Sequence, residues 1–223
     1  MKLNNLLLYK NLDKSPWQKP ALDLLDHFFP TWAKMSDAEL LNIENSNPKT
    51  MARVDSLWNG IPIYFSQRDN YTMPDRTCNS SSNAMYLLSF APWLLWDKGD
   101  NEFLNRVLAY GDTIYHENQT KVLADYGVKT SWKTDKNETK LLELCKVKTP
   151  SVVNILHRGT KGSYRGGHMI LIYDFDVKTQ EYIYHDPYGN IKTNYQSGSN
   201  GKSNRITRTE FMNRWQGGYR TRA

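Results

Sequence analysis

The strongest constraint on the fold is the order of the predicted elements along the 223-residue chain. Three strand-like runs follow Pro150 in succession, at residues 151–158, 168–176 and 181–187. Only the four residues VKTQ separate the last two runs, which is typical of a hairpin. Helical patterns come before these strands, so the order predicts an α+β fold with a helical part packed on an antiparallel sheet.

Apolar residues recur at helical spacing in most of the chain before Pro150. The predicted helices cover residues 20–29, 36–45, 79–90, 102–110, 117–126 and 138–147, and a short one covers 207–215. Short strands are predicted at 6–9, 61–67 and 128–133, a closing loop at 45–48, and a long Gly/Ser/Asn-rich loop at 189–204. Ser36 and Glu39 have the spacing of a capping box.

The chain divides into two parts near residue 58. Residues 1–58 form either an N-terminal helical arm packed on the main domain or a small accessory module, and the arm is the favoured interpretation. Residues 59–223 form the main domain, because the patterns tighten from Ile61 onward.

Cys78 stands where a polar loop changes into an apolar helical run. The positive end of a helix, together with an adjacent imidazolium, favours the reactive thiolate form of a cysteine. Asn79 and the three serines after it predict a capped, hydrated helix start, whereas a structural cysteine would have apolar neighbours. Cys145 has such neighbours in TKLLELCKV, so we interpret Cys78 as a candidate nucleophile and Cys145 as a core residue.

His168 follows two glycines and begins an apolar strand, and Asp186 ends the next strand. We expect His168 to act as a base and Asp186 to orient it by accepting the proton of its Nδ1. Asp186 also begins Asp-Pro-Tyr-Gly, a good turn sequence, so a purely structural role stays open. His185 is less useful, because neighbours on a strand face opposite sides. Gln67 is a candidate donor to an oxyanion, together with the backbone N–H of Cys78.

The charge of the chain points to anionic partners. Lys and Arg give a net charge of +6 and a pI near 9.1, which favours encounter with polyanions. The positive residues are scattered except for a C-terminal group (Arg205, Arg208, Arg214, Arg220 and Arg222), so a solvated surface is an equal alternative to a binding patch.

Several other classes of site find no support in the sequence. There is no phosphate-binding loop, dinucleotide fingerprint, EF-hand loop or paired CxxC, so no cofactor or metal is predicted. Nothing indicates specific recognition of nucleic acid. The apolar runs are too short to span a membrane, and the N-terminus does not resemble a signal peptide. These features predict a protein made in the cytoplasm, with no membrane insertion.

Five segments together resemble a known family: IPIYFSQRDN, RTCNSSSNAM, KTPSVVNILHR, GGHMILIYDFD and YIYHDPYG. They are similar to the C39-like branch of papain-like cysteine peptidases, in the free-standing phage or bacterial form, over about residues 60–190. The resemblance implies a papain-like fold with Cys78 as nucleophile, His168 as base, Asp186 as orienting residue and Gln67 as oxyanion donor. The chain has Thr-Cys-Asn where many relatives have Asp-Cys-Gly, and it lacks the transporter parts of leader peptidases.

The leading functional hypothesis is a thiol-dependent lytic peptidase that cleaves peptidoglycan peptides, similar to a phage endolysin. Its expected partners are a peptide or peptidoglycan substrate and an anionic cell-wall polymer, which it would meet after the membrane is breached. Two alternatives are a cysteine protease that matures a protein and a catalytically silent binding module of the same fold. The set of four candidate residues argues against the silent module.

Overall fold

The computed structural model describes residues 5–11, 16–95, 98–196 and 200–223. Within these ranges, one antiparallel sheet contains all the strands, in the order β1-β6-β2-β3-β4-β5. The strands are β1 (Thr130–Lys133), β2 (Ser151–Arg158), β3 (Arg165–Asp176), β4 (Glu181–His185), β5 (Asn204–Thr207) and β6 (Trp215–Arg222). The predicted α+β class is confirmed.

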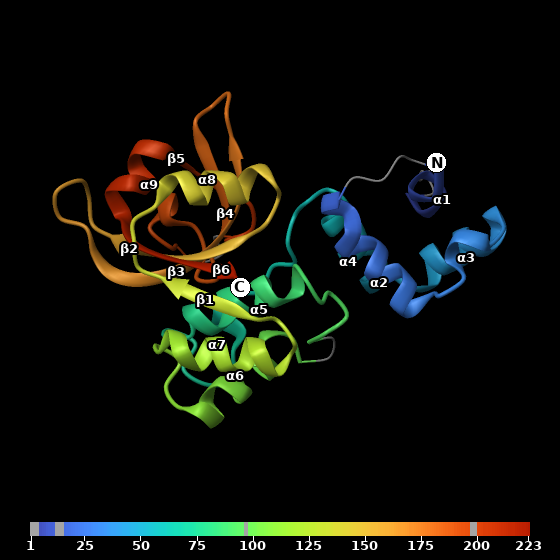
Figure 1. Cartoon of the computed structure of the whole chain (residues 1–223), viewed down its shortest axis with the longest axis horizontal. Coiled ribbons are helices and arrows are strands. Elements are labelled where there is room, and N and C mark those ends of the chain that lie inside the picture. The colour runs from blue at the N-terminus through green and yellow to red at the C-terminus, as the bar shows by residue number, and fades with distance from the viewer. Residues whose placement is uncertain (1–4, 12–15, 96–97, 197–199) are drawn as a thin grey trace.

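Most of the helices come before the first strand along the chain, and some of them cover the sheet. They are α1 (Asn5–Asn11), α2 (Lys19–Phe28), α3 (Asp37–Ser46), α4 (Pro48–Trp58), α5 (Cys78–Leu88), α6 (Asp100–Tyr110), α7 (His116–Asp125), α8 (Glu138–Lys146) and α9 (Arg208–Arg214). Figure 1 shows α1–α4 gathered at one end of the molecule, away from the sheet. Helices α5, α6 and α7 lie together below the sheet, and α8 and α9 lie on its other side.

The two faces of the central strands pack into different apolar cores, because successive side chains of a strand alternate. Val152 and Leu171 belong to the core that contains α5. Val153 and Ile170 belong to a second core, with Leu141 of α8. The sheet is therefore covered on both sides, which fixes the register of the β2–β3 and β3–β4 pairs.

Helix α5 is buried on all sides, so its serines are not hydrated as the sequence suggested. They bond instead to the elements around the helix. Ser80 shares a 2.5 Å hydrogen bond with Thr113, and Ser82 donates to the backbone oxygen of Met169 at 3.1 Å. Ser81 donates to Asp100 at the start of α6. These bonds satisfy the buried hydroxyls, and they hold the first turns of α5 in place.

The N-terminal helices are attached to the main domain by a buried arginine of α4. Arg53 donates to the backbone oxygens of Pro92 at 3.1 Å and Leu94 at 3.3 Å, just after α5. Burial lowers the pKa of Arg53 to about 10. The capping box of α3 is present as predicted, with Ser36 N donating to the Glu39 carboxylate at 2.7 Å.

Three expectations about secondary structure are wrong. Residues 6–9 are helical in α1, where Tyr9 stacks on Trp58 at 4.0 Å between ring centroids. Residues 61–66 have no regular structure, although Gln67 N pairs with the Pro187 oxygen at 2.8 Å. The predicted loop at 45–48 is reduced to Asn47, because α3 ends at Ser46 and α4 begins at Pro48.

Strands β5 and β6 were missed by the sequence analysis. The end of the predicted loop at 189–204 pairs with β4 through β5, and residues 197–199 of that loop lie outside the described residues. Strand β6 pairs with both β1 and β2. It includes Gly217 and Gly218, and glycine weakens the usual strand pattern.

Replacing Cys145 by serine is predicted to destabilise the protein by about 1–3 kcal/mol, because a hydroxyl would be buried in an apolar core. The Cys145 side chain is buried beside Leu141, and burial raises the pKa of its thiol to about 12. Chemical denaturation measures the effect, with Cys78→Ser as the matched control at a less buried cysteine. Equal stability of Cys145→Ser and the wild type would show that this thiol is not a packing residue.

Candidate active site

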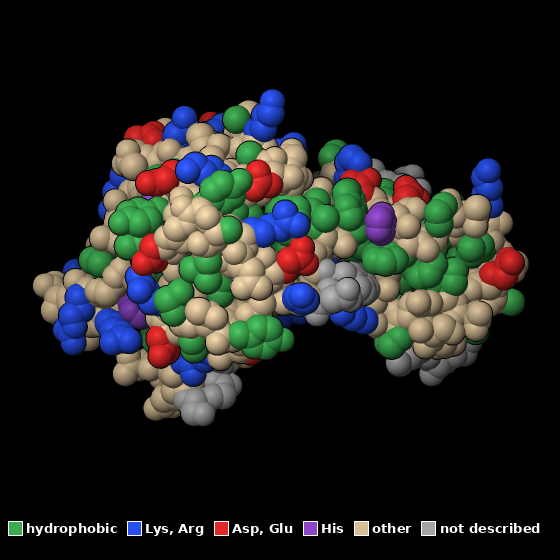
Figure 2. Space-filling view, turned by 90° about the horizontal axis from the view of Figure 1, so that it is seen from below, with side chains coloured by type: hydrophobic (Ala, Val, Ile, Leu, Met, Phe, Trp, Pro, Cys, Tyr) green, Lys and Arg blue, Asp and Glu red, His purple; other side chains and the backbone are tan. Residues whose placement is uncertain are grey.

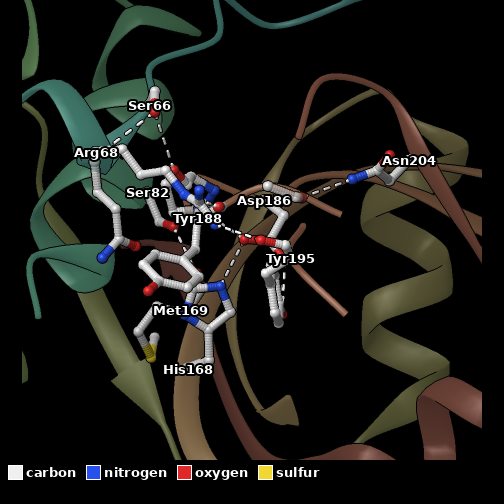
Figure 3. A network of polar contacts seen from close by, with 12 residues as sticks. Ser66, Arg68, Ser82, His168, Met169, Asp186, Tyr188, Tyr195 and Asn204 are labelled. Carbon is white, nitrogen blue, oxygen red and sulfur yellow. Dashed lines mark hydrogen bonds and ion pairs between the residues drawn. The ribbon is translucent and has the colours of Figure 1, made fainter. Parts of the chain in front are cut away.

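A buried histidine–aspartate pair joins the β3–β4 hairpin to the loop after it. Leu171 pairs with His185, and this register brings His168 of β3 close to Asp186, the residue after β4. His168 Nε2 lies 2.6 Å from Asp186 Oδ1 (Figure 3). The two residues are only 4% and 0% exposed, so the bond lies out of reach of bulk water.

The remaining hydrogen bonds of Asp186 come from the same loop. Its Oδ1 also accepts from Tyr188 N at 2.9 Å, and its Oδ2 accepts from the Tyr195 hydroxyl at 3.1 Å (Figure 3). Gly189 N donates to the Asp186 backbone oxygen at 3.2 Å, which closes the predicted turn. Asp186 thus shapes the turn and contacts His168 at the same time.

The ring nitrogen that faces Asp186 is not the expected one. The sequence analysis assigned the aspartate to Nδ1 of His168, whereas the structure places Nε2 against it. Nδ1 is thereby the ring nitrogen left for Cys78. The aspartate still orients the imidazole, but from the opposite edge of the ring.

Cys78 is the first residue of α5, one residue before the predicted start of this helix, and its side chain is partly exposed. Together with His168 it lines a cavity of about 250 Å³, to which Asn154 and Gln216 also contribute. The Cys78 side chain is close enough to the imidazole to raise the pKa of His168. Asp186 therefore bonds to His168 inside the protein, and Cys78 shares the open cavity with the same histidine.

The electrostatics of this group favour a charged imidazole. Burial by itself lowers the pKa of His168. The Asp186 carboxylate, and after it the Cys78 sulfur, outweigh that effect and hold the pKa of His168 above its ordinary value of 6.5. An imidazolium next to a cysteine stabilises the thiolate, which is the nucleophilic form.

Gln67 is buried, and its side chain faces the loop that follows it and leads to Cys78. Its Nε2 donates to the backbone oxygen of Pro74 at 2.7 Å, and its Oε1 has no partner among the described residues. Gln67 does not line the cavity that Cys78 and His168 share. One amide hydrogen is left for another acceptor, so the oxyanion role of Gln67 stays a prediction.

Two residues at the site were not assigned to it from the sequence. The His157 ring stacks on the His168 ring with 4.7 Å between centroids, and burial lowers the pKa of His157 to about 4. Tyr195 bonds to Asp186 from the loop that was predicted only as Gly/Ser/Asn-rich. Little in the sequence indicated these two roles. His157 stands at the end of a predicted strand, and Tyr195 is a single tyrosine in a polar segment.

His185, in contrast, lies outside the site, in agreement with the sequence analysis. Its Nε2 donates to the Pro62 oxygen at 2.8 Å, and its Nδ1 accepts from Ser203 N at 3.0 Å. Burial lowers the pKa of His185 to about 4, so its ring is neutral.

Within the described part of the chain, no cluster of three or more His, Cys, Asp or Glu side chains could hold a metal ion. No helix in that part is long and apolar enough to cross a membrane.

Comparison with known proteins identifies the family of the chain. The model of the Peptidase_C39 like family matches residues 59–221. The chain belongs to this family. A search of curated protein sequences found no match. Membership implies peptide hydrolysis by a cysteine peptidase, and it does not identify the substrate.

Solved structures show the shared fold. A C39-like peptidase from Bacillus anthracis is 13% identical, with a TM-score of 0.52 over 74% of this chain and 95% of that chain. A double glycine motif protease of an AMS/PCAT transporter, solved with a leader peptide, is 16% identical, with a TM-score of 0.45 over 65% and 82%. The peptidase domain of Streptococcus ComA is 16% identical, with a TM-score of 0.44 over 67% and 92%. The first of these shows that the fold is that of a C39, papain-like peptidase.

Iodoacetamide is predicted to modify Cys78 rapidly at pH 6.5 and to leave Cys145 unmodified in the folded protein. An imidazolium beside a cysteine makes its sulfur more reactive, whereas burial raises the pKa of the Cys145 thiol to about 12. His168→Ala should slow the modification at pH 6.5 by about tenfold or more. His27→Ala, in the N-terminal helix α2, is the matched control. Equal rates at Cys78 in the wild type and in His168→Ala would contradict an activated pair. Mass spectrometry of the peptides measures both sites.

Proposed function

We propose that the chain is a cysteine peptidase in which Cys78, His168 and Asp186 form the catalytic triad. The observation that carries the proposal is the buried 2.6 Å bond between His168 and Asp186, with Cys78 lining one cavity together with the same histidine. Family membership supports the reaction class.

The reaction would follow the positions of these atoms. The thiolate of Cys78 attacks the carbonyl carbon of a peptide bond, and a thioester forms as the C–N bond breaks. The His168 imidazolium gives its Nδ1 proton to the leaving amine. The neutral ring then takes a proton from water as its oxygen attacks the thioester; the C–S bond breaks, which releases the carboxylic acid and restores the Cys78 thiolate and the His168 imidazolium. Asp186 keeps the ring oriented through Nε2 in both steps.

The developing oxyanion needs donors near the start of α5. The backbone N–H of Cys78 lies at the N-terminus of that helix, where backbone N–H groups have no intrahelical partner. The second amide hydrogen of Gln67 Nε2 is the proposed partner donor. Donors of this kind contribute about 2.7–4 kcal/mol each to transition-state stabilisation.

The proposed substrates are the peptides of bacterial cell-wall peptidoglycan. A net charge of +6 favours encounter with an anionic wall, and it makes binding sensitive to salt. The enzyme would then act as a lytic peptidase, once it reaches the wall through a breached membrane. Anionic wall polymers are proposed as additional binding partners.

Purified peptidoglycan incubated with the protein is predicted to release new amino groups from its stem peptides, detected by mass spectrometry. Cys78→Ala should lower the rate by more than about 10³-fold, the scale seen when a triad nucleophile is removed. Cys145→Ser, which removes the other thiol, should retain the activity under conditions where it is folded.

Two other outcomes would contradict parts of the proposal. An intact wall together with cleavage of casein by the same preparation would contradict the wall substrate and favour a protein-maturation protease. No cleavage of either substrate by the folded protein would contradict the peptidase itself and leave a silent binding module.

A further inference from the structure

Two arginines stand directly opposite each other on the hairpin that leads to His168. Arg158 of β2 and Arg165 of β3 are cross-strand partners, and both are exposed. Like charges in this position destabilise an antiparallel pair. In the part of the chain that the structure describes, neither guanidinium has an ion pair or hydrogen bond to a carboxylate. Such a pairing is expected to cost some stability, and no carboxylate among the described residues offsets it.

The acidic side chain that contacts this hairpin already has partners. Glu210 of α9 accepts from Arg214 Nε at 2.6 Å and from the Tyr164 hydroxyl at 2.6 Å. Arg214 is buried under the hairpin and also donates to the Gly159 oxygen at 3.3 Å. Glu210 therefore does not neutralise Arg158 or Arg165. In Figure 2, Lys and Arg side chains gather beside a histidine at the left end of the molecule, where the β2–β3 turn projects in Figure 1.

The two arginines line a polar cavity that adjoins the candidate active site. Its volume is about 390 Å³, and its other walls include Tyr188 and Tyr195. The rings of these two tyrosines lie 6.3 and 6.1 Å from the ring of His168, measured between centroids. A group bound by the arginines would thus be separated from the imidazole by these tyrosine rings, in a cavity that neither Cys78 nor His168 lines.

The tyrosine wall is held in a strained backbone conformation. Asn194 and Tyr195 have φ values of 51° and 59°, in the left-handed region that bulky residues rarely adopt. Arg68 Nη2 donates to the Tyr195 oxygen at 3.0 Å, and the Tyr195 hydroxyl donates to Asp186. Strain of this kind persists only where surrounding contacts hold it, and it occurs most often at functional sites.

We propose that Arg158 and Arg165 form a subsite that binds a carboxylate of the peptide substrate against the tyrosine wall of the candidate active site. A guanidinium presents paired N–H groups that match the two oxygens of a carboxylate. The inference rests on the proposed peptide hydrolysis, and it narrows the substrate class to peptides that carry an acidic side chain or a free C-terminus near the scissile bond.

Matched peptides test the subsite. A set of seven-residue peptides carries either Glu or Gln at one position at a time, and each is made with a free or an amidated C-terminus. We expect one carboxylate position to raise kcat/KM roughly tenfold over its neutral partner, the scale of a hydrogen bond to a charged group. Arg158→Gln/Arg165→Gln should remove this ratio, and added salt should reduce it.

The control removes two positive charges at the opposite end of the domain. Lys146 and Arg222 line a different cavity, next to Pro150 at the start of β2. Lys146→Gln/Arg222→Gln should keep the preference for the carboxylate. The melting temperature gives a second readout, because Arg158→Gln/Arg165→Gln relieves a repulsion and should not melt below the wild type.

Binding of the same peptides to Cys78→Ala, followed by fluorescence anisotropy, separates the subsite from catalysis. If no peptide is hydrolysed by the wild type, the proposed function fails, and the binding ratio of the Glu and Gln peptides still decides the subsite. A ratio near one at every position would overturn the subsite. So would a preference that survives in Arg158→Gln/Arg165→Gln.

Discussion

The 2.6 Å contact between His168 and Asp186 is the interaction on which the rest of the site depends. A fully buried carboxylate is costly unless it is paired and hydrogen-bonded, and here it receives bonds from His168, Tyr188 and Tyr195. The same carboxylate keeps the pKa of His168 high, and by binding Nε2 it leaves Nδ1 as the ring nitrogen available to Cys78. Removing Asp186 would therefore remove both the charge and the orientation of the imidazole.

The fold around this pair leaves little freedom for the loop after β4. Asp186 N donates to the Gly201 oxygen at 2.9 Å, and Gln67 N donates to the Pro187 oxygen at 2.8 Å. A Cβ added at Gly201 would fall 1.7 Å from the Asp186 oxygen, so only glycine fits this close approach. The segment before α5 and the loop after β4 are thus fastened to each other, which links the position of Cys78 to that of Asp186.

Much of this arrangement could be predicted from the sequence because it depends on local patterns. Helix α5 begins at Cys78, and the β3–β4 hairpin places His168 near Asp186, as the strand periodicity indicated. Which nitrogen faces Asp186 could not be read from the chain, since it depends on how the ring rotates within the packed hairpin.

The tertiary contacts of the irregular segments could not be predicted from the sequence either. Tyr195 reaches Asp186 only because its backbone adopts a positive φ that Arg68 helps to hold. The opposition of Arg158 and Arg165 follows from the register of β2 and β3, and the strand patterns alone do not specify which residues pair.

The protonation of His168 tests the central claim most directly. Its folded-state pKa lies above the ordinary 6.5, so the stabilisation by the ion pair is complete below pH 6.5 and is lost as the pH rises through the raised value. In ¹⁵N-edited NMR of histidine-labelled protein, we expect His168 to keep protons on both ring nitrogens at pH 8, and to become neutral there in Asp186→Asn. A wild-type His168 ring that is neutral at pH 7 would contradict the account.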